Sequence, residues 1–138
     1  MSDPIVVDSS IGIGWIHPGQ ANDLTRHLLQ EAKNGTAIYV PELWHLEIAN
    51  TLLVFVRRKL LTEAQRQAGL TLLSQLRVIV DDETNRLAFS TVSELAVQYT
   101  LSVYDAAYLE LARRKSLPLA TRDEALKAAA KRSGIKLL

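Results

Sequence analysis

The residues of this chain whose type and position indicate chemistry are four acids that lie far apart in the sequence: Asp8, Glu47, Asp105 and Asp123. Asp8 closes the apolar run from residue 5 to 7, and Asp123 closely follows the apolar run from residue 117 to 120. Four carboxylates that converge without a cation repel one another, which raises some of their pKa values and costs stability. The positions therefore predict a cradle for a divalent cation.

The ligand types available restrict which metal such a cradle would hold. The chain has no Cys, and its three His residues, His17, His27 and His45, lack metal-ligand spacing, so we expect them to be structural or surface residues. Carboxylate oxygens suit the hard cations Mg²⁺ or Mn²⁺. The absence of Cys also fits a reducing compartment, and the cytosol is the expected location.

Glu47 differs from the other acids because it lies inside a predicted helix rather than after a strand. That helix is apolar around much of its circumference between residues 43 and 56, so we expect neighbouring elements to cover most of it. A carboxylate beside packed surface needs a partner. Asn50, three residues on and on the same face, could share or orient its contact. The alternative is that Glu47 reaches solvent or pairs with a basic side chain.

Helix capping offers a competing explanation for two of the acids. Ser102-x-x-Asp105 and Thr121-x-x-Glu124 match the capping box, as does Thr62-x-x-Gln65. Asp105 could thus be the third residue of a helix, and Asp123 a first-turn acid favoured by the helix dipole. Taken singly, each acid remains open between a cap and a site.

Five short apolar segments bounded by charges or turn formers predict strands buried on both faces. They cover residues 5–8, 37–40, 77–80, 117–120 and 135–138, and helical spacing predicts helices over 21–33, 42–59, 62–76, 84–99, 104–115 and 123–133. The alternation predicts one α/β domain over residues 1–138, with a mainly parallel five-stranded sheet between two helical layers. Ligands of such sheets bind outside the carboxyl ends of the strands, where Asp8 and Asp123 lie.

Composition and missing motifs exclude several classes. At 138 residues, 48% hydrophobic and 22% charged, the chain is typical of a compact globular protein, and no apolar run is long enough to cross a bilayer. There is no P-loop and no dinucleotide fingerprint, and Gly12-Ile13-Gly14 indicates only a turn. The net charge of +1 leaves phosphate attraction to local clusters, Arg57-Arg58-Lys59 and Arg113-Arg114-Lys115, which we interpret as solvated cations at helix ends.

Four segments together resemble the PIN-domain family, and specifically the VapC-type toxins of toxin–antitoxin pairs. They are Val7-Asp8-Ser9-Ser10, then Pro41-Glu42-Leu43 leading to Glu47-Ile48-Ala49-Asn50, then Tyr104-Asp105-Ala106-Ala107-Tyr108, and finally Ala120-Thr121-Arg122-Asp123. The resemblance spans essentially the whole chain. It implies a PIN fold, dependence on Mg²⁺ or Mn²⁺, and endoribonuclease activity with the four acids as catalytic and metal-binding residues.

The resemblance also implies supporting residues and partners. Ser10 and Thr121 match hydroxyl positions that orient the acids, and Glu124 is either an outer ligand or the capping-box residue. Arg122, next to Asp123, is either a phosphate contact or a solvated loop cation. The implied partners are an RNA substrate, a second copy of the chain and a VapB-like antitoxin, with DNA reached only through the antitoxin and no membrane. The exposed apolar surface expected of the helix from Trp44 to Val56 independently predicts a subunit interface.

Two other functions stay open from the sequence. A non-catalytic RNA-binding or scaffolding module of the same fold would retain the acids as structure. A phosphoacceptor regulator would use Asp81 and Asp82 after the third strand, although it lacks the paired acids expected after the first strand. The sequence does not identify the RNA, the antitoxin, or the number of metal ions.

Overall fold

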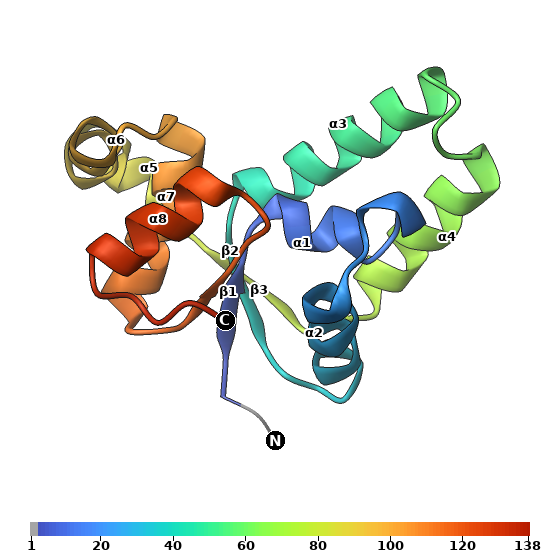
Figure 1. Cartoon of the computed structure of the whole chain (residues 1–138), viewed down its shortest axis with the longest axis horizontal. Coiled ribbons are helices and arrows are strands. Elements are labelled where there is room, and N and C mark those ends of the chain that lie inside the picture. Colours follow the sequence, from blue (N-terminus) through green and yellow to red (C-terminus); the bar gives the residue numbers. More distant parts are fainter. Residues whose placement is uncertain (1–2) are drawn as a thin grey trace.

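The structure is a computed structural model and describes residues 3–138. Figure 1 shows a small parallel sheet between two groups of helices, with α1 to α4 on one side and α5 to α8 on the other. The strands are β1 (Ile5–Val7), β2 (Ile38–Pro41), β3 (Val78–Asp81) and β4 (Leu119–Ala120), in the spatial order β3-β2-β1-β4. All three strand pairs are parallel and helices lie on both sides of the sheet, so the predicted parallel sheet between two helical layers is confirmed.

The helices follow in an order that fits right-handed connections between parallel strands. Those before β3 are α1 (Ser9–Gly14), the 3₁₀ turn η1 (Pro18–Gln20), α2 (Asp23–Lys33), α3 (Leu43–Arg57) and α4 (Glu63–Ser74). Those after it are α5 (Thr84–Leu87), the π-helical segment η2 (Ala88–Val92), α6 (Ser93–Tyr99), α7 (Val103–Lys115) and α8 (Glu124–Arg132). The chain runs from β1 through β2 to β3 in one direction and then returns to β4, which places the later helices on the opposite face.

The prediction of a fifth strand over residues 135–138 is wrong for the described part of the chain. Leu137 forms only an isolated parallel bridge to Leu119. The Leu119 amide donates to the Lys136 carbonyl at 2.9 Å, and the Leu138 amide donates to the Leu119 carbonyl at 3.0 Å. Because β4 has only two residues, it offers too few backbone groups on this side to form a longer ladder.

The prediction that Gly12-Ile13-Gly14 forms a turn is also wrong. These residues are buried in α1, which packs on α3. A Cβ atom added to Gly12 would lie 2.5 Å from Ile48 Cδ1 and 3.1 Å from Trp44 Cζ2. Glycine is therefore required at residue 12 for the close approach of two helices, a reason that a local sequence pattern does not reveal.

The predicted continuous helix over 84–99 is interrupted by η2, where the Ser93 hydroxyl donates to the Ala88 carbonyl at 2.6 Å. The predicted cover over α3 is wrong as well, because the chain buries only Trp44, Ile48 and Leu52 of this helix. Leu46 on α3 is 75% exposed. None of the helices formed by residues 3–138 has the length and apolar character that a membrane span requires.

Candidate functional site

The candidate site lies where the chain connections diverge, at the carboxyl ends of β1 and β4. These strands are neighbours, yet β1 is followed by helices on one face of the sheet and β4 by a helix on the other. Such a switch point leaves a crevice that loops and helix ends can line. Asp8 follows β1 directly, and residues 121–123 follow β4.

Asp8 is the most constrained of the four acids, with 3% of its surface exposed. Its Oδ1 accepts from the Ser10 hydroxyl at 2.6 Å and the Ile11 amide at 3.3 Å, and its Oδ2 accepts from the Thr121 hydroxyl. Burial raises the pKa of Asp8, nearby Asp105 raises it further, and these three donors oppose the rise. The carboxylate is therefore fixed in one orientation between β1 and β4.

Glu47 reaches the site because a hydrogen bond holds the start of α3 against the residue that follows β1. The Trp44 indole N–H donates to the Asp8 carbonyl at 3.1 Å, and Glu47 lies about one helical turn later. The Tyr108 hydroxyl of α7 donates to Glu47 Oε1 at 2.6 Å. Burial raises the pKa of Glu47, the Tyr108 hydrogen bond opposes this, and Asp105 and Asp8 raise it further.

Asp105 enters from the first turn of α7, where its amide donates to Ser102 Oγ at 3.0 Å, the cap expected for that helix. Burial raises the pKa of Asp105, and the charge of Asp123 raises it further. The electrostatic contacts of Asp105 thus extend to Asp8, Glu47 and Asp123. The fold has brought acids from four separate segments into one group.

Asp123 is exposed and caps α8, since its Oδ2 accepts from the Leu126 amide at 2.8 Å. The predicted capping box with Thr121 as cap is wrong. Thr121 Oγ1 instead donates to Asp8 and accepts from the Asp123 amide at 3.0 Å, which links two of the acids. Glu124 is exposed and forms an ion pair with Lys127 at 3.3 Å.

The group has the donor chemistry of a site for a hard cation. It supplies only carboxylate oxygens from the four acids. Burial is the main cause of the raised pKa values of Asp8, Glu47 and Asp105, and repulsion between the acids adds to it. A divalent ion relieves that repulsion. Within residues 3–138, however, no three His, Asp or Glu side chains are placed closely enough to hold one ion together. A cation shared by the group therefore requires the more exposed carboxylates to turn inward.

The structure places the supporting residues predicted from sequence in different ways. Ser10 and Thr121 both donate to Asp8, as described above. Asn50 is exposed, and Tyr108 rather than Asn50 holds Glu47 in the described part of the chain. The Arg122 amide donates to Ser10 Oγ at 2.8 Å, and Arg122 Nη1 donates to Gln20 Oε1 at 2.7 Å.

Tyr108 and Trp44 are the site residues that the sequence reasoning missed. Tyr108 is fully buried, and burial together with the Glu47 contact raises its pKa, so the hydroxyl remains a donor at any working pH. It is the last residue of the Tyr-Asp-Ala-Ala-Tyr segment and lies three residues after Asp105, on the same side of α7. That helical spacing was the available signal.

A second charged group, around Arg114, is separate from the site. The Arg114 guanidinium bonds to Asp81, Glu83 and Glu110 at distances between 2.7 and 3.1 Å. The expectation that this cation is solvated at a helix end is therefore wrong for Arg114. The ion pair with Arg114 lowers the pKa of Asp81. Because this carboxylate is already paired within the fold, a phosphoacceptor role is disfavoured.

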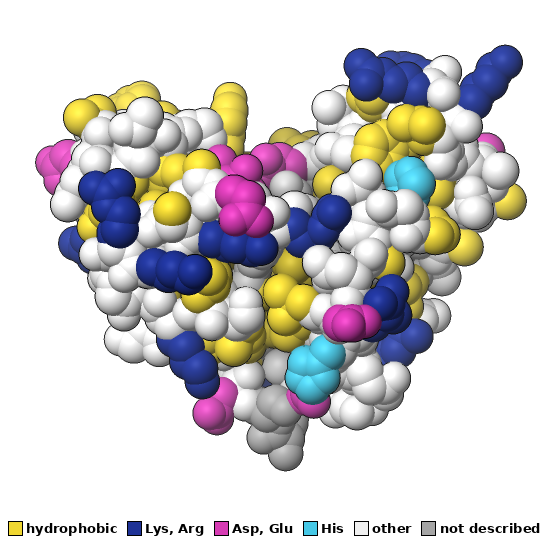
Figure 2. Space-filling model, in the orientation of Figure 1, with side chains coloured by type: hydrophobic (Ala, Val, Ile, Leu, Met, Phe, Trp, Pro, Cys, Tyr) yellow, Lys and Arg dark blue, Asp and Glu magenta, His cyan; other side chains and the backbone are white. Residues whose placement is uncertain are grey.

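The outer surface reflects this arrangement. Figure 2 shows a notch between two arms of the molecule, with acidic side chains gathered at its floor and basic ones next to them. Large apolar side chains are exposed on both arms, on α3 and on the segment from η2 to α7: Leu46, Phe89, Val97, Val103 and Tyr104. Such exposure is typical of contact surfaces.

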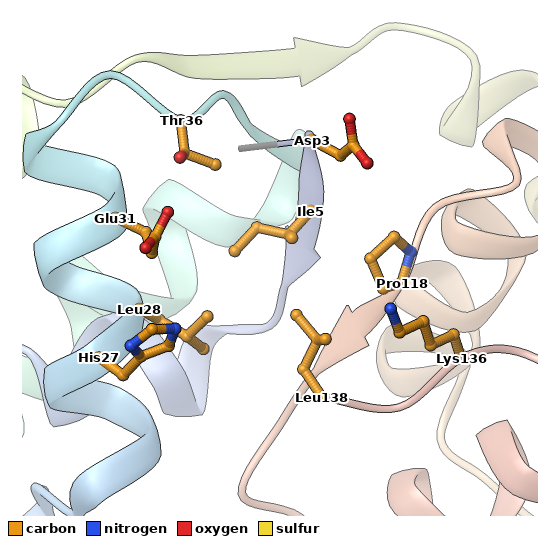
Figure 3. Close-up of a pocket in the computed structure, with 9 residues that line it drawn as sticks. All are labelled: Asp3, Ile5, His27, Leu28, Glu31, Thr36, Pro118, Lys136 and Leu138. Atoms are coloured by element: carbon orange, nitrogen blue, oxygen red, sulfur yellow. The ribbon is translucent and has the colours of Figure 1, made fainter. Parts of the chain in front are cut away.

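A cavity of about 420 Å³ lies at the opposite end of the sheet (Figure 3). Asp3 and Ile5 at the start of β1, Pro118 before β4, and His27 of α2 contribute to its lining. None of the four acids lines it, so this cavity does not coincide with the candidate chemistry.

Comparison with known proteins agrees with this geometry. Residues 5–132 match the family model described as the PIN domain. Among curated proteins, none matches the sequence.

Three solved structures share the fold. PAE2754 from Pyrobaculum aerophilum is 24% identical with a TM-score of 0.71, and the match covers 97% of this chain and 83% of that one. VapBC2 from Rickettsia felis, bound to a promoter DNA fragment, is 16% identical with a TM-score of 0.65, and the match covers 98% of this chain and 97% of that one. FitAcB from Neisseria gonorrhoeae is 17% identical with a TM-score of 0.64, covering 97% and 96%.

Proposed function

The chain belongs to the PIN domain family, and we propose that it is a Mg²⁺- or Mn²⁺-dependent endoribonuclease of the VapC toxin type. The observation that carries the proposal is the convergence of Asp8, Glu47, Asp105 and Asp123 at the carboxyl ends of β1 and β4, with Asp105 coupled electrostatically to the other three. A cluster of carboxylates with raised pKa values at a switch point has the composition of a two-metal or one-metal phosphodiesterase site.

In this proposal Asp8 and Asp105 are the direct ligands, and Glu47 and Asp123 complete the shell directly or through water. The bound cation would activate a water molecule for in-line attack on the RNA phosphodiester and offset charge on the leaving oxygen. Ser10 and Thr121 hold the Asp8 carboxylate in a fixed orientation, and Tyr108 does the same for Glu47. Fixed ligand orientation is the usual contribution of such hydrogen-bonding neighbours. The products should carry 5′-phosphate and 3′-hydroxyl ends.

The decisive experiment is cleavage of a structured RNA by purified protein in Mg²⁺, in chelator, and as the Asp8→Asn variant. Asp82→Asn is a matched control, because Asp82 is an exposed acid outside the site. Cleavage should require Mg²⁺ and be lost in Asp8→Asn but not in Asp82→Asn. Cleavage that persists in chelator and in Asp8→Asn would indicate a contaminating nuclease and reject the proposal.

A second candidate is a non-catalytic RNA-binding or scaffolding module. It is favoured by the finding that no three carboxylates within residues 3–138 are already placed to share an ion. This alternative predicts RNA binding that persists when all four acids are neutralised, and no Mn²⁺ anomalous peak among them in a crystal.

We also propose a homodimer and a VapB-like antitoxin as partners, both in the cytosol. Leu46 on α3 supports an interface because this large apolar side chain is exposed in the described part of the chain. The antitoxin rests on the VapC resemblance, supported by the shared fold with the Rickettsia felis VapBC2 structure. Sedimentation as a monomer at micromolar concentration would contradict the dimer.

A further inference from the structure

Arg122 follows β4 next to Asp123 and forms an ion pair with none of the four acids of the site in the part of the chain that the structure describes. It stands between Thr121 and Asp123, and its backbone amide bonds to the same Ser10 hydroxyl that donates to Asp8. No ion pair within residues 3–138 includes Arg122. The side chain of Arg122 is instead held by an uncharged group.

Gln20 is the residue that holds the Arg122 side chain. Its side-chain oxygen accepts from Arg122 Nη1 at 2.7 Å, and it is the last residue of η1, on the opposite side of the switch point from α8. An amide oxygen accepts a hydrogen bond but carries no net charge, so Gln20 orients the guanidinium without neutralising it. The positive charge of Arg122 therefore remains available to another anion.

The contrast with Arg114 shows what this means chemically. Arg114 donates hydrogen bonds to three carboxylates, which compensate its positive charge, so its role is structural. Arg122 is half-buried and its side chain has one partner among residues 3–138, so most of the five N–H donors of its planar fork are not used by this part of the chain. That geometry suits a phosphate oxygen pair.

We propose that Gln20 and Arg122 form a phosphodiester-binding subsite beside the four acids. Arg122 binds non-bridging oxygens of one phosphate of a single-stranded RNA, and Gln20 is the positioning residue that keeps the guanidinium away from the carboxylates. This proposal rests on the proposed ribonuclease function. It adds a positively charged group that attracts the RNA backbone to a site that is otherwise acidic. Because phosphate contacts carry no base information, the subsite contributes affinity rather than sequence preference.

The test measures RNA binding in chelator, where the proposed cleavage does not occur. Fluorescence anisotropy of a labelled 12-nucleotide oligouridine is recorded over a range of salt concentrations for the full chain. Arg122→Gln should weaken binding about fivefold and reduce the slope of log affinity against log salt by about 0.7, the contribution of one phosphate contact on a single strand.

Gln20→Met is the discriminating variant because it changes no charge. Released from Gln20, the guanidinium should turn to a neighbouring carboxylate, so the salt slope should fall in the same direction as in Arg122→Gln. Gln30→Met is the matched control, since Gln30 is exposed on α2 and its side chain donates to Asn34 Oδ1 at 3.4 Å, away from Arg122. The double variant Gln20→Met/Arg122→Gln should bind no worse than Arg122→Gln alone.

The outcomes separate this subsite from the activity. If Gln20→Met binds RNA like Gln30→Met, Gln20 does not position Arg122 and the proposal is overturned. If Arg122→Gln and Arg122→Lys both keep the parent affinity and slope, Arg122 contacts no phosphate, and an acidic side chain of a protein partner becomes its better ligand. Wild-type cleavage in Mg²⁺ is decided independently, so either result leaves the ribonuclease proposal standing or falling on its own assay.

Discussion

Asp105→Asn should stabilise the metal-free protein while abolishing activity. Asp105 interacts unfavourably with three other carboxylates, and each like-charge pair at a partly exposed position costs about 0.2–0.5 kcal/mol. Removing one charge therefore adds about 1 kcal/mol to the free energy of unfolding. For a chain of this length, that raises the melting temperature by about 3 °C. Asn keeps the side-chain size and the backbone bond to Ser102.

Mg²⁺ should reverse the order of stability, so that wild type becomes more stable than Asp105→Asn. A cation at tenfold its dissociation constant adds about 1.4 kcal/mol to wild type, and the variant should lose most of this gain. The assay is a thermal melt of both proteins in chelator and in Mg²⁺, with Asp82→Asn as the control for a lost surface charge. A variant that is less stable than wild type in chelator would refute the repulsion argument. A variant that gains as much as wild type from Mg²⁺ would show that Asp105 does not bind the ion.

Three further perturbations have defined outcomes. Tyr108→Phe removes the donor to Glu47 and should cost about 1.5–3 kcal/mol in urea unfolding; an unchanged midpoint would mean that the bond contributes nothing. Gly12→Val would drive a side chain into Ile48 and should cost about 2–3 kcal/mol; a stable variant would contradict the close helix approach.

The third is pH. Asp8, Glu47 and Asp105 have raised pKa values in the folded protein. Their contribution to the free energy of unfolding is fully present below the pKa of the unfolded chain, near 4, and is lost as the pH rises through the higher pKa values of the folded protein. In chelator, stability should fall over that range and Mg²⁺ should flatten the fall. Asp81, whose pKa is lowered, acts oppositely and loses its contribution only as the pH falls below about 4. A flat profile in chelator would be inconsistent with raised pKa values at Asp8, Glu47 and Asp105.

Much of the fold was predictable because its strands are short, fully apolar segments and its helices begin at capping residues. The Thr62-x-x-Gln65 box forms with both hydrogen bonds, which fixed the start of α4 correctly. The errors came where one segment depends on another. The segment at 135–138 reads as a strand, yet the two-residue β4 gives it only Leu119 to pair with. Residues 12–14 read as a turn until α3 is packed against them.

The sequence by itself was sufficient to select the four acids as candidate site residues, since Asp8 and Asp123 follow apolar strands and all four lie in segments that resemble one family. Local patterns are sufficient for this because strand ends and helix first turns are set by nearby residues. Only the tertiary structure decided how those acids are held. Tyr108 rather than Asn50 donates to Glu47, and Thr121 donates to Asp8 rather than capping α8. Gln20 accepts a hydrogen bond from Arg122. These partners come from different elements, and their choice depends on packing distances that no single segment encodes.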